Sequence, residues 1–537
     1  MCIAIEELPD ELLLHIIRHT NELADWPQCA AVSQLWARLV ASNRTELHFP
    51  PWAPIEQVTH VLLAGLRSTQ PLRKICMHLD NPTFWPGRSA SLKALHHLVG
   101  TSSTSLSSLE LSGREPFSLT PLAPIVEALA NEPSLALDCL DLSWAEPPPG
   151  AVLSALLDRV AASPTVLKVL RIKGCATLDE AIFKARVAPL VPHLTELSLA
   201  GCLAISGGVV AEVVSSGAAL TSLDLSLLRL SPTALCRCLA QPQLRHSLRR
   251  LGLSGYTSLP ASSIAYALIV CERLTDVNFS ASLLTDDALG EAAAVMPTHL
   301  AALQRVRISE CSSVTCIGLA ALCSLAGGNL RHLDIGGPFS SLRDDAAATL
   351  AAHSTSLRTL SFGCCRLSAA GMRALAPLAA NLEQLDLSGS ADLERDALAQ
   401  ILRRMGPGCG ARLRVLTLRG CADAVSDELL AGFIPRAHGL QQLNIAGCHK
   451  LTDLSARLIA SARARALLRL RQVDISGCRR LTKRGRKELS RAIPVLVNDD
   501  SFVNDDDKLC RESCELHADG TVTEVIMRQL GELELCL

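Results

Sequence analysis

The stretch Leu440-Gln441-Gln442-Leu443-Asn444-Ile445-Ala446-Gly447-Cys448 shows the pattern that recurs through most of this 537-residue chain. Its apolar residues follow the spacing L-x-x-L-x-L. The same spacing recurs between residues 72 and 470, with one start about every 28 residues, the length of a unit that pairs a strand with a helix. Its fifteen starts are Leu72, Leu106, Leu137, Leu167, Leu194, Leu220, Leu248, Leu274, Leu303, Leu330, Leu357, Leu382, Leu413, Leu440 and Leu470.

Each repeat is expected to contribute one strand and one helix. The last two apolar residues of the pattern are two positions apart, so they point to the same buried side of a strand. Residues 427–436 and 454–462 carry apolar residues at helical spacing. The sequence therefore predicts an α/β leucine-rich-repeat solenoid over residues 72–495, a ribonuclease-inhibitor-like horseshoe of about 14–15 repeats with its strands on the concave side. The composition, 49% apolar but only 3% aromatic, suits a thin aliphatic core.

Seven cysteines stand eight residues after the first leucine of their repeats, where the chain leaves the strand. Buried thiols of this size can fill such a turn. A metal site or a disulfide is the competing interpretation, but a solenoid places these residues in a row and not in a tetrahedron. The stretch from Gly447 to Asp453 closely resembles the cysteine-containing repeats of the F-box/leucine-rich-repeat family. The seven are Cys175, Cys202, Cys311, Cys365, Cys421, Cys448 and Cys478.

Residues 1–48 precede the repeats and do not share their spacing. Leu8-Pro9-Asp10-Glu11-Leu12 has a proline followed by acids, which indicates the start of a helix. This segment, together with Ala31-Val32-Ser33-Gln34-Leu35-Trp36, resembles an F-box. It departs from the family at Trp26-Pro27-Gln28-Cys29, where a more leucine-rich stretch is usual. The expected organisation is a small all-α F-box at 1–48, a linker or cap at 49–71, the solenoid at 72–495, and a tail with a possible capping helix at 496–537.

The resemblance to an F-box implies a role and a set of partners. Such a domain docks on a Skp-type adaptor, which joins it to the cullin and RING subunits of an SCF ubiquitin ligase. The chain would then be a non-catalytic receptor that binds a target protein through its repeats. The alternative is that the same residues form only the core of a capping domain, which a solenoid end needs. The residues that would face the adaptor are Leu8, Pro9, Leu12, Leu13, Ile16, Val32 and Trp36.

The fourth residue after each first leucine should point into the concave face, where a target would bind. It is often acidic, which gives a broken acidic stripe that could hold a basic segment of a partner. A solvated face that charge keeps soluble is the competing interpretation. Phe84 and Trp85 are a further candidate anchor, with burial under the first repeats as the alternative. The candidate target-binding residues are Glu110, Asp141, Asp224, Arg307, Asp334, Asp386 and Asp474.

Several other functions are disfavoured. The net charge of −2 argues against a nucleic-acid partner, and no apolar run reaches the ~18 residues that span a bilayer. The acidic N-terminus is not that of a secretory signal, so a cytoplasmic or nuclear location is expected. No catalytic or cofactor motif was found, and Cys510, Cys514, His517 and Cys536 lack a standard zinc spacing. A repeat scaffold without a ligase role, or a receptor gated by a small molecule, remain alternatives.

Overall fold

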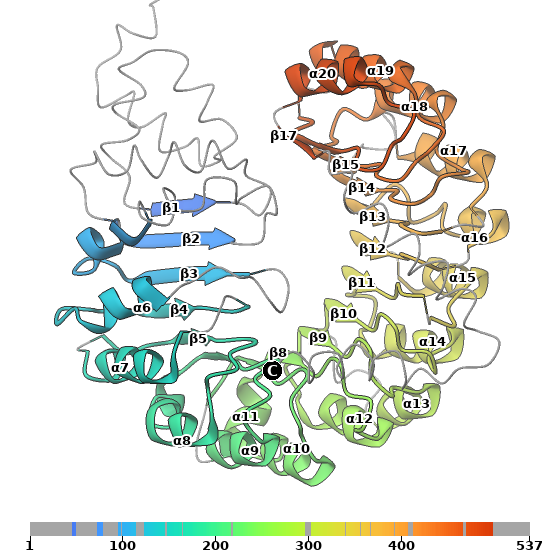
Figure 1. Ribbon diagram of the computed structural model, residues 1–537. Helices are drawn as coiled ribbons and strands as arrows, with labels where there is room; N and C mark the ends of the chain where they lie inside the picture. The colour runs from blue at the N-terminus through green and yellow to red at the C-terminus, as the bar shows by residue number, and fades with distance from the viewer. Residues whose placement is uncertain are drawn as a thin grey trace, which may run out of the picture. The chain divides into compact units, whose positions relative to one another are not determined.

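The computed structural model describes residues 46–49, 72–78 and, with short gaps, 95–497. The chain divides into two compact units, Met1–Leu251 and Gly252–Leu537, with the boundary inside one strand. In each unit, parallel strands follow one another in chain order and the helices line the other face of the repeats (Figure 1). This arrangement is the predicted α/β leucine-rich-repeat solenoid.

The first unit contains short strands joined by helical segments. Its strands are β1 (Glu46–Phe49), β2 (Lys74–His78), β3 (Ser108–Ser112), β4 (Cys139–Asp141), β5 (Val169–Arg171), β6 (Glu196–Ser198), β7 (Ser222–Asp224) and the boundary strand β8 (Arg250–Gly252). Its helices are α6 (Ala123–Ala130), α7 (Gly150–Ala161), α8 (Glu180–Ile182), the π-helix η4 (Phe183–Val187), the 3-10 helix η5 (Val191–His193), α9 (Gly207–Ser215), α10 (Pro232–Leu239) and α11 (Pro242–Ser247).

The second unit repeats the scheme more regularly. Its strands are β9 (Asp276–Asn278), β10 (Arg305–Arg307), β11 (His332–Asp334), β12 (Thr359–Ser361), β13 (Gln384–Asp386), β14 (Val415–Thr417), β15 (Gln442–Asn444), β16 (Gln472–Asp474) and β17 (Val495–Val497). Its helices are α12 (Ala261–Val270), α13 (Asp286–Val295), α14 (Cys316–Leu325), α15 (Asp344–His353), α16 (Ala369–Ala374), α17 (Arg395–Arg404), α18 (Asp427–Phe433), the 3-10 helix η6 (Ile434–Arg436), α19 (Asp453–Arg465) and α20 (Lys483–Ala492).

Strands β2 to β16 coincide one for one with the fifteen leucine patterns. Two further strands were not predicted. β1 pairs with β2, with Glu46 opposite Lys74, and β17 pairs with β16, with Val495 opposite Gln472. Neither strand carries the L-x-x-L-x-L spacing, so the pattern could not find them.

The core is a stack of leucine rows, one residue from each repeat in each row. Leu416 of β14 lies opposite Leu443 of β15, which lies opposite Val473 of β16. All three are at most 1% exposed, as is Ile445, two residues beyond Leu443. The predicted helices at 427–436 and 454–462 are confirmed as α18 with η6 and as α19. One repeat therefore buries its apolar face only against its neighbours, as a solenoid requires.

The seven repeat cysteines are buried and form no disulfide among the described residues, as expected for a structural role. The thiol of Cys202 lies 3.0 Å from the carbonyl oxygen of Ile172 in the preceding repeat, and that of Cys421 lies 3.0 Å from Leu387 O. Burial raises the pKa of Cys202, Cys365 and Cys421 to about 12. These thiols are therefore neutral donors to the neighbouring repeat and poor nucleophiles.

Aspartates at helix starts tie successive repeats together. Asp427, the first residue of α18, accepts hydrogen bonds from the backbone N–H of Thr452 at 3.0 Å and from its hydroxyl at 2.6 Å, and from the hydroxyl of Ser455. Asp453 of α19 holds Thr482 in the same way, at 2.8 and 2.6 Å. Each aspartate thus fixes the N-terminus of the next helix along the chain.

Replacing Asp427 with alanine should cost about 1–2 kcal/mol of unfolding free energy, because partly buried donors of Thr452 and Ser455 lose their acceptor. Burial raises the pKa of Asp427, but the hydrogen bonds from Ser455 and Thr452 outweigh it, and the net shift is downward from 3.8. The stabilisation is therefore present above the unfolded-state pKa and is lost as the pH falls through the lower folded-state pKa. Urea denaturation of both proteins across that range checks this: a difference that stays constant with pH would contradict it.

Candidate binding surface

All seven candidate target-binding residues lie on strands, at positions that alternate with the buried leucines. Asp141, Asp224, Arg307, Asp334, Asp386 and Asp474 each end a strand, and Glu110 lies inside β3. Asp141 is buried, at 7% exposure, and the other six are half-buried. The seven adaptor-facing candidates, Phe84, Trp85 and the cysteines of the tail lie outside the described residues.

The aspartates at the fourth position after the first leucine of each repeat have a structural role. In Asp386 one carboxylate oxygen accepts from the backbone N–H of Ser388, two residues later, at 2.8 Å. The same bond recurs where the position holds asparagine: Asn444 accepts from Ala446 N–H at 3.0 Å. It also recurs at Asp141, Asp224, Asn278, Asp334 and Asp474. Aspartate and asparagine both close such turns, so much of the recurrence of acids here follows from the backbone and not from a ligand.

In the first unit the acids are neutralised by cations on neighbouring strands. Arg171 lies at the centre: its Nε is 2.6 Å from Glu196, and its Nη1 is 3.4 Å from both Glu110 and Asp141. Lys74 pairs with Glu110 at 2.7 Å, and Arg250 pairs with Glu196. Three cations thus meet three carboxylates. We call this group the Arg171 network: Lys74, Glu110, Asp141, Arg171, Glu196 and Arg250.

The pKa shifts of the groups around Arg171 agree with this balance of charges. Burial raises the pKa of the Glu110 carboxyl, but the bond from Lys74 and the charge of Arg171 outweigh it and hold that pKa below its usual value. Burial raises the pKa of Cys76 and Cys139 beside it to about 11, so neither thiol adds a negative charge. Asp224 pairs with Lys173 at 2.7 Å. The carboxylates that the structure describes on the strand face of the first unit, Glu110, Asp141, Glu196 and Asp224, are therefore each paired with a cation.

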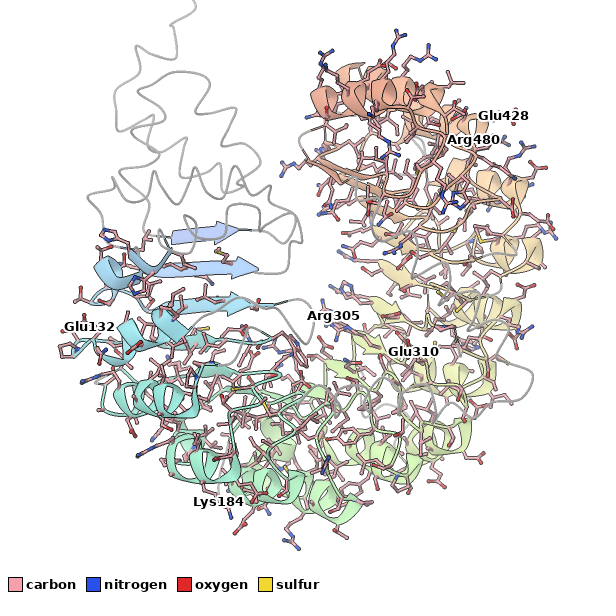
Figure 2. The ribbon with its side chains drawn as sticks, viewed as in Figure 1. Glu132, Lys184, Arg305, Glu310, Glu428 and Arg480 are labelled. Atoms are coloured by element: carbon pink, nitrogen blue, oxygen red, sulfur yellow. The ribbon has the colours of Figure 1, made fainter. Side chains whose placement is uncertain are left out.

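The second unit differs from the first in how its acids are paired with cations. Arg307 pairs with Asp276 at 3.6 Å, as does Arg305 at 3.0 Å. Figure 2 shows Arg305 on the strand side of this unit, whereas Glu428 lies on the helix side. Asp334 and Asp386 form no ion pair with any cation among the described residues. Of the candidate acids on the described strands, those without an ion pair therefore lie on the strand face of the second unit.

The sequence pattern did not reveal that one further position of the repeat has a special role. The seventh residue after the first leucine has a positive φ in every repeat from Leu137 onward, and in eight of them it is glycine. Trp144 occupies this position in its repeat with φ 57°. Its ring covers the next two glycines, because a Cβ on Gly174 would lie 2.2 Å from Trp144 Cε3 and one on Gly201 would lie 2.6 Å from Trp144 Cη2. A tryptophan at a position where eight repeats have glycine is the signal that could have revealed it.

No group of three or more His, Cys, Asp or Glu side chains is arranged to hold a metal ion in the part of the chain that the structure describes. Among the same residues, no helix has both the length and the apolar character needed to cross a membrane.

Comparison with solved structures gives weak likenesses. A chain from the yeast complex of Rad7 and Elc1 is 18% identical with a TM-score of 0.44, over 67% of this chain and 93% of that one. The leucine-rich repeat-containing protein LegL7 from Legionella pneumophila is 18% identical with a TM-score of 0.35, over 60% and 98% respectively. No curated protein matches the sequence.

Family models match two parts of the sequence. A model described as F-box-like matches residues 5–46, and one described as Leucine Rich repeat matches residues 353–376, which include β12. The first match contains every residue expected to face an adaptor, and the second lies within the solenoid. The chain thus carries an F-box-like domain ahead of leucine-rich repeats, which is the domain composition of the F-box/leucine-rich-repeat proteins.

Proposed function

We propose that the chain is the substrate-recognition subunit of an SCF-type E3 ubiquitin ligase. The observation that carries the proposal is the F-box-like match at residues 5–46 ahead of a solenoid of fifteen patterned repeats. The F-box would dock a Skp-type adaptor and, through it, the cullin and RING subunits. Such domains are typical of non-catalytic receptors, and the chain would act by holding a target near a ubiquitin-loaded enzyme, which raises the effective concentration of the target.

Within this proposal the target binds the strand face of the second unit. There Asp334 and Asp386 each commit one oxygen to a turn and keep the other without an ion pair among the described residues. A basic segment of a target would complement these carboxylates. The equivalent acids of the first unit, Glu110 and Asp141, already face Arg171. The proposed location is the cytoplasm, the nucleus or both.

Adaptor recovery tests the proposed function directly. Wild type and a Leu8→Asp/Pro9→Ala variant are each co-expressed with a Skp-type adaptor and purified through a tag on the chain. The variant should recover at least about tenfold less adaptor, because a carboxylate would be buried in an apolar interface without a partner. An Arg403→Gln/Arg404→Gln variant, altered on exposed positions of α17, serves as the matched control and should recover as much as wild type.

The variant must retain its solenoid, which circular dichroism and the thermal midpoint report. Equal recovery of adaptor by wild type and the Leu8→Asp/Pro9→Ala variant would reject the ligase role. In that case the chain is a repeat scaffold that binds a protein without linking it to a ligase.

A further inference from the structure

The last two helices of the second unit carry a concentration of cations that the proposed function does not use. Seven of the thirteen residues from 479 to 491 are Lys or Arg and one is Glu, although the whole chain has a net charge of −2. Helices α18, α19 and α20 lie side by side at the end of the helix row of this unit (Figure 1). We call the exposed cations there the α19–α20 basic face: Arg457, Arg479, Arg480, Lys483, Arg484, Lys487 and Arg491.

The two helices that carry this face are held closely together. Asp453, the first residue of α19, accepts from the backbone N–H and the hydroxyl of Thr482 at 2.8 and 2.6 Å, which fixes the N-terminus of α20 against α19. A Cβ on Gly485 would collide with the same carboxylate, so glycine there permits the close approach. The hydrogen bond from Thr482 is the main cause that lowers the pKa of Asp453, and the charges of Arg457 and Arg484 add to it. Cations of both helices therefore belong to one surface.

The protein does not neutralise the cations of this face. None of the seven forms an ion pair with a carboxylate in the described part of the chain. Arg486 of the same helix is not part of the face, because its guanidinium donates to the carbonyls of Leu481 and Cys478 at 3.1 and 3.2 Å. On the neighbouring helix α18 the exposed Glu428 pairs with Arg395 at 2.7 Å. Uncompensated positive charge therefore extends along the ten residues of α20, a length of about 15 Å.

An exposed apolar side chain stands beside these cations. Leu454, the second residue of α19, is 48% exposed and lies one helical turn before Arg457. Arg484 is likewise the second residue of α20, so the two side chains occupy equivalent places on neighbouring helices, whose axes are about 10 Å apart. Cations around an apolar side chain are typical of surfaces that lie on anionic lipid, where the charges meet the headgroups and the apolar group enters the layer below them.

The surroundings of the face favour a lipid surface over a nucleic acid. Single-stranded nucleic acids stack their bases on aromatic side chains, and residues 470–497 contain no Phe, Tyr or Trp. A helix N-terminus is a common phosphate site, but at α20 the carboxylate of Asp453 already accepts from the N–H of Thr482. A bilayer instead offers many laterally mobile anions, which can match cations spread over two helices.

We propose that the α19–α20 basic face binds an anionic lipid surface, with Leu454 entering the boundary between headgroups and acyl chains. The chain then lies on the membrane and does not cross it. This contact is independent of the ligase role. A receptor held in this way would meet its targets at the membrane surface.

Vesicle co-sedimentation of the purified full-length chain tests the proposal. The probes are vesicles of phosphatidylcholine alone and of phosphatidylcholine with about one-third phosphatidylserine. The chain should bind the anionic vesicles at least about tenfold more tightly, and increasing salt should weaken this binding. Lys483→Gln/Lys487→Gln should lose at least about tenfold in affinity, because each cation near an anionic surface is worth about fivefold. The matched control, Arg403→Gln/Arg404→Gln, removes the same charge from α17 and should keep the wild-type affinity.

Two further variants extend the test. Arg479→Gln/Arg480→Gln removes two cations from the turn before α20 and should show the same loss as Lys483→Gln/Lys487→Gln, with circular dichroism and the thermal midpoint reporting that each variant is folded. Leu454→Ser leaves the charge unchanged and should lose about threefold or more in vesicle affinity, because no apolar side chain then leaves water on binding.

Equal binding of the two kinds of vesicle would overturn the proposal. Anionic-vesicle binding that both double variants of the face retain, or that Leu454→Ser retains in full, would also overturn it. A glutamate-rich peptide and an oligouridine are measured with the same proteins. If either bound more tightly than the anionic vesicles, and the double variants lost that binding, the face would belong to an acidic protein segment or to RNA and the proposal would be wrong.

Discussion

Replacing Arg171 with alanine should destabilise the first unit by about 3 kcal/mol, close to the values found when one partner of a buried ion pair is removed. The guanidinium faces Glu110, Asp141 and Glu196, whose side chains are 9–19% exposed. Without it, three carboxylates remain close together, with only Lys74 and Arg250 near two of them. Arg171→Lys should lie between the two proteins, because an ammonium cannot form the same forked contacts.

The loss of unfolding free energy in Arg171→Ala should depend on pH, because it arises from the charge of the carboxylates around Arg171. In wild type the pKa of Glu110 is lowered, so its stabilisation is present above the unfolded-state pKa and is lost as pH falls through the folded-state pKa. In the variant the crowded carboxylates gain a raised pKa, and protonation relieves their repulsion. The difference between the two proteins should therefore be larger at pH 7 than at pH 4.

Urea denaturation followed by circular dichroism at both pH values measures the effect, because urea, unlike a guanidinium salt, does not screen ion pairs. Arg186→Ala is the matched control: Arg186 pairs with Asp158 at 2.7 Å, but both side chains are more than 40% exposed. Such an exposed pair contributes less than about 1 kcal/mol. If Arg171→Ala and Arg186→Ala lost the same unfolding free energy, the Arg171 network would stabilise the first unit no more than an exposed ion pair does.

The repeats could be predicted because their signal is local. Three apolar residues within six positions define each strand, and the pattern Leu440/Leu443/Ile445 reappears as β15 with its leucines buried. The terminal strands β1 and β17 could not be found this way, since they add to the sheet without that leucine spacing. Their place is set by pairing with β2 and β16 and not by a pattern of their own.

The charge balance of the strand face could not be predicted. Arg171 reaches Glu110, 61 residues earlier, and Glu196, 25 residues later, so only the stacking of the repeats reveals that they meet. The sequence did indicate that position four is often acidic. It also contained a clue to the explanation, because Asn278 and Asn444 share that position and asparagine makes the same turn contact as aspartate.

Gly174→Ala should cost about 3 kcal/mol in the presence of Trp144 and only about 1 kcal/mol in its absence. Gly174 has φ +68°, where any other residue costs roughly 1–2 kcal/mol. The added Cβ would also lie 2.2 Å from the Trp144 ring, which must move out of its contact with Gly201. The clash disappears in a Trp144→Ala background, so the double-mutant cycle should show a coupling of about 1–2 kcal/mol.

Denaturation followed by circular dichroism measures the cycle without relying on the fluorescence of the deleted tryptophan. Gly100→Ala is the control, because Gly100 is helical and nothing lies within 4 Å of the position that its Cβ would take. Alanine there should leave stability unchanged or raise it by up to about 1 kcal/mol. Additive effects of Gly174→Ala and Trp144→Ala would show that the ring does not rest on the glycine row. Coupling would instead establish that Gly174 and Gly201 make room for the ring of Trp144, which packs across two successive repeats.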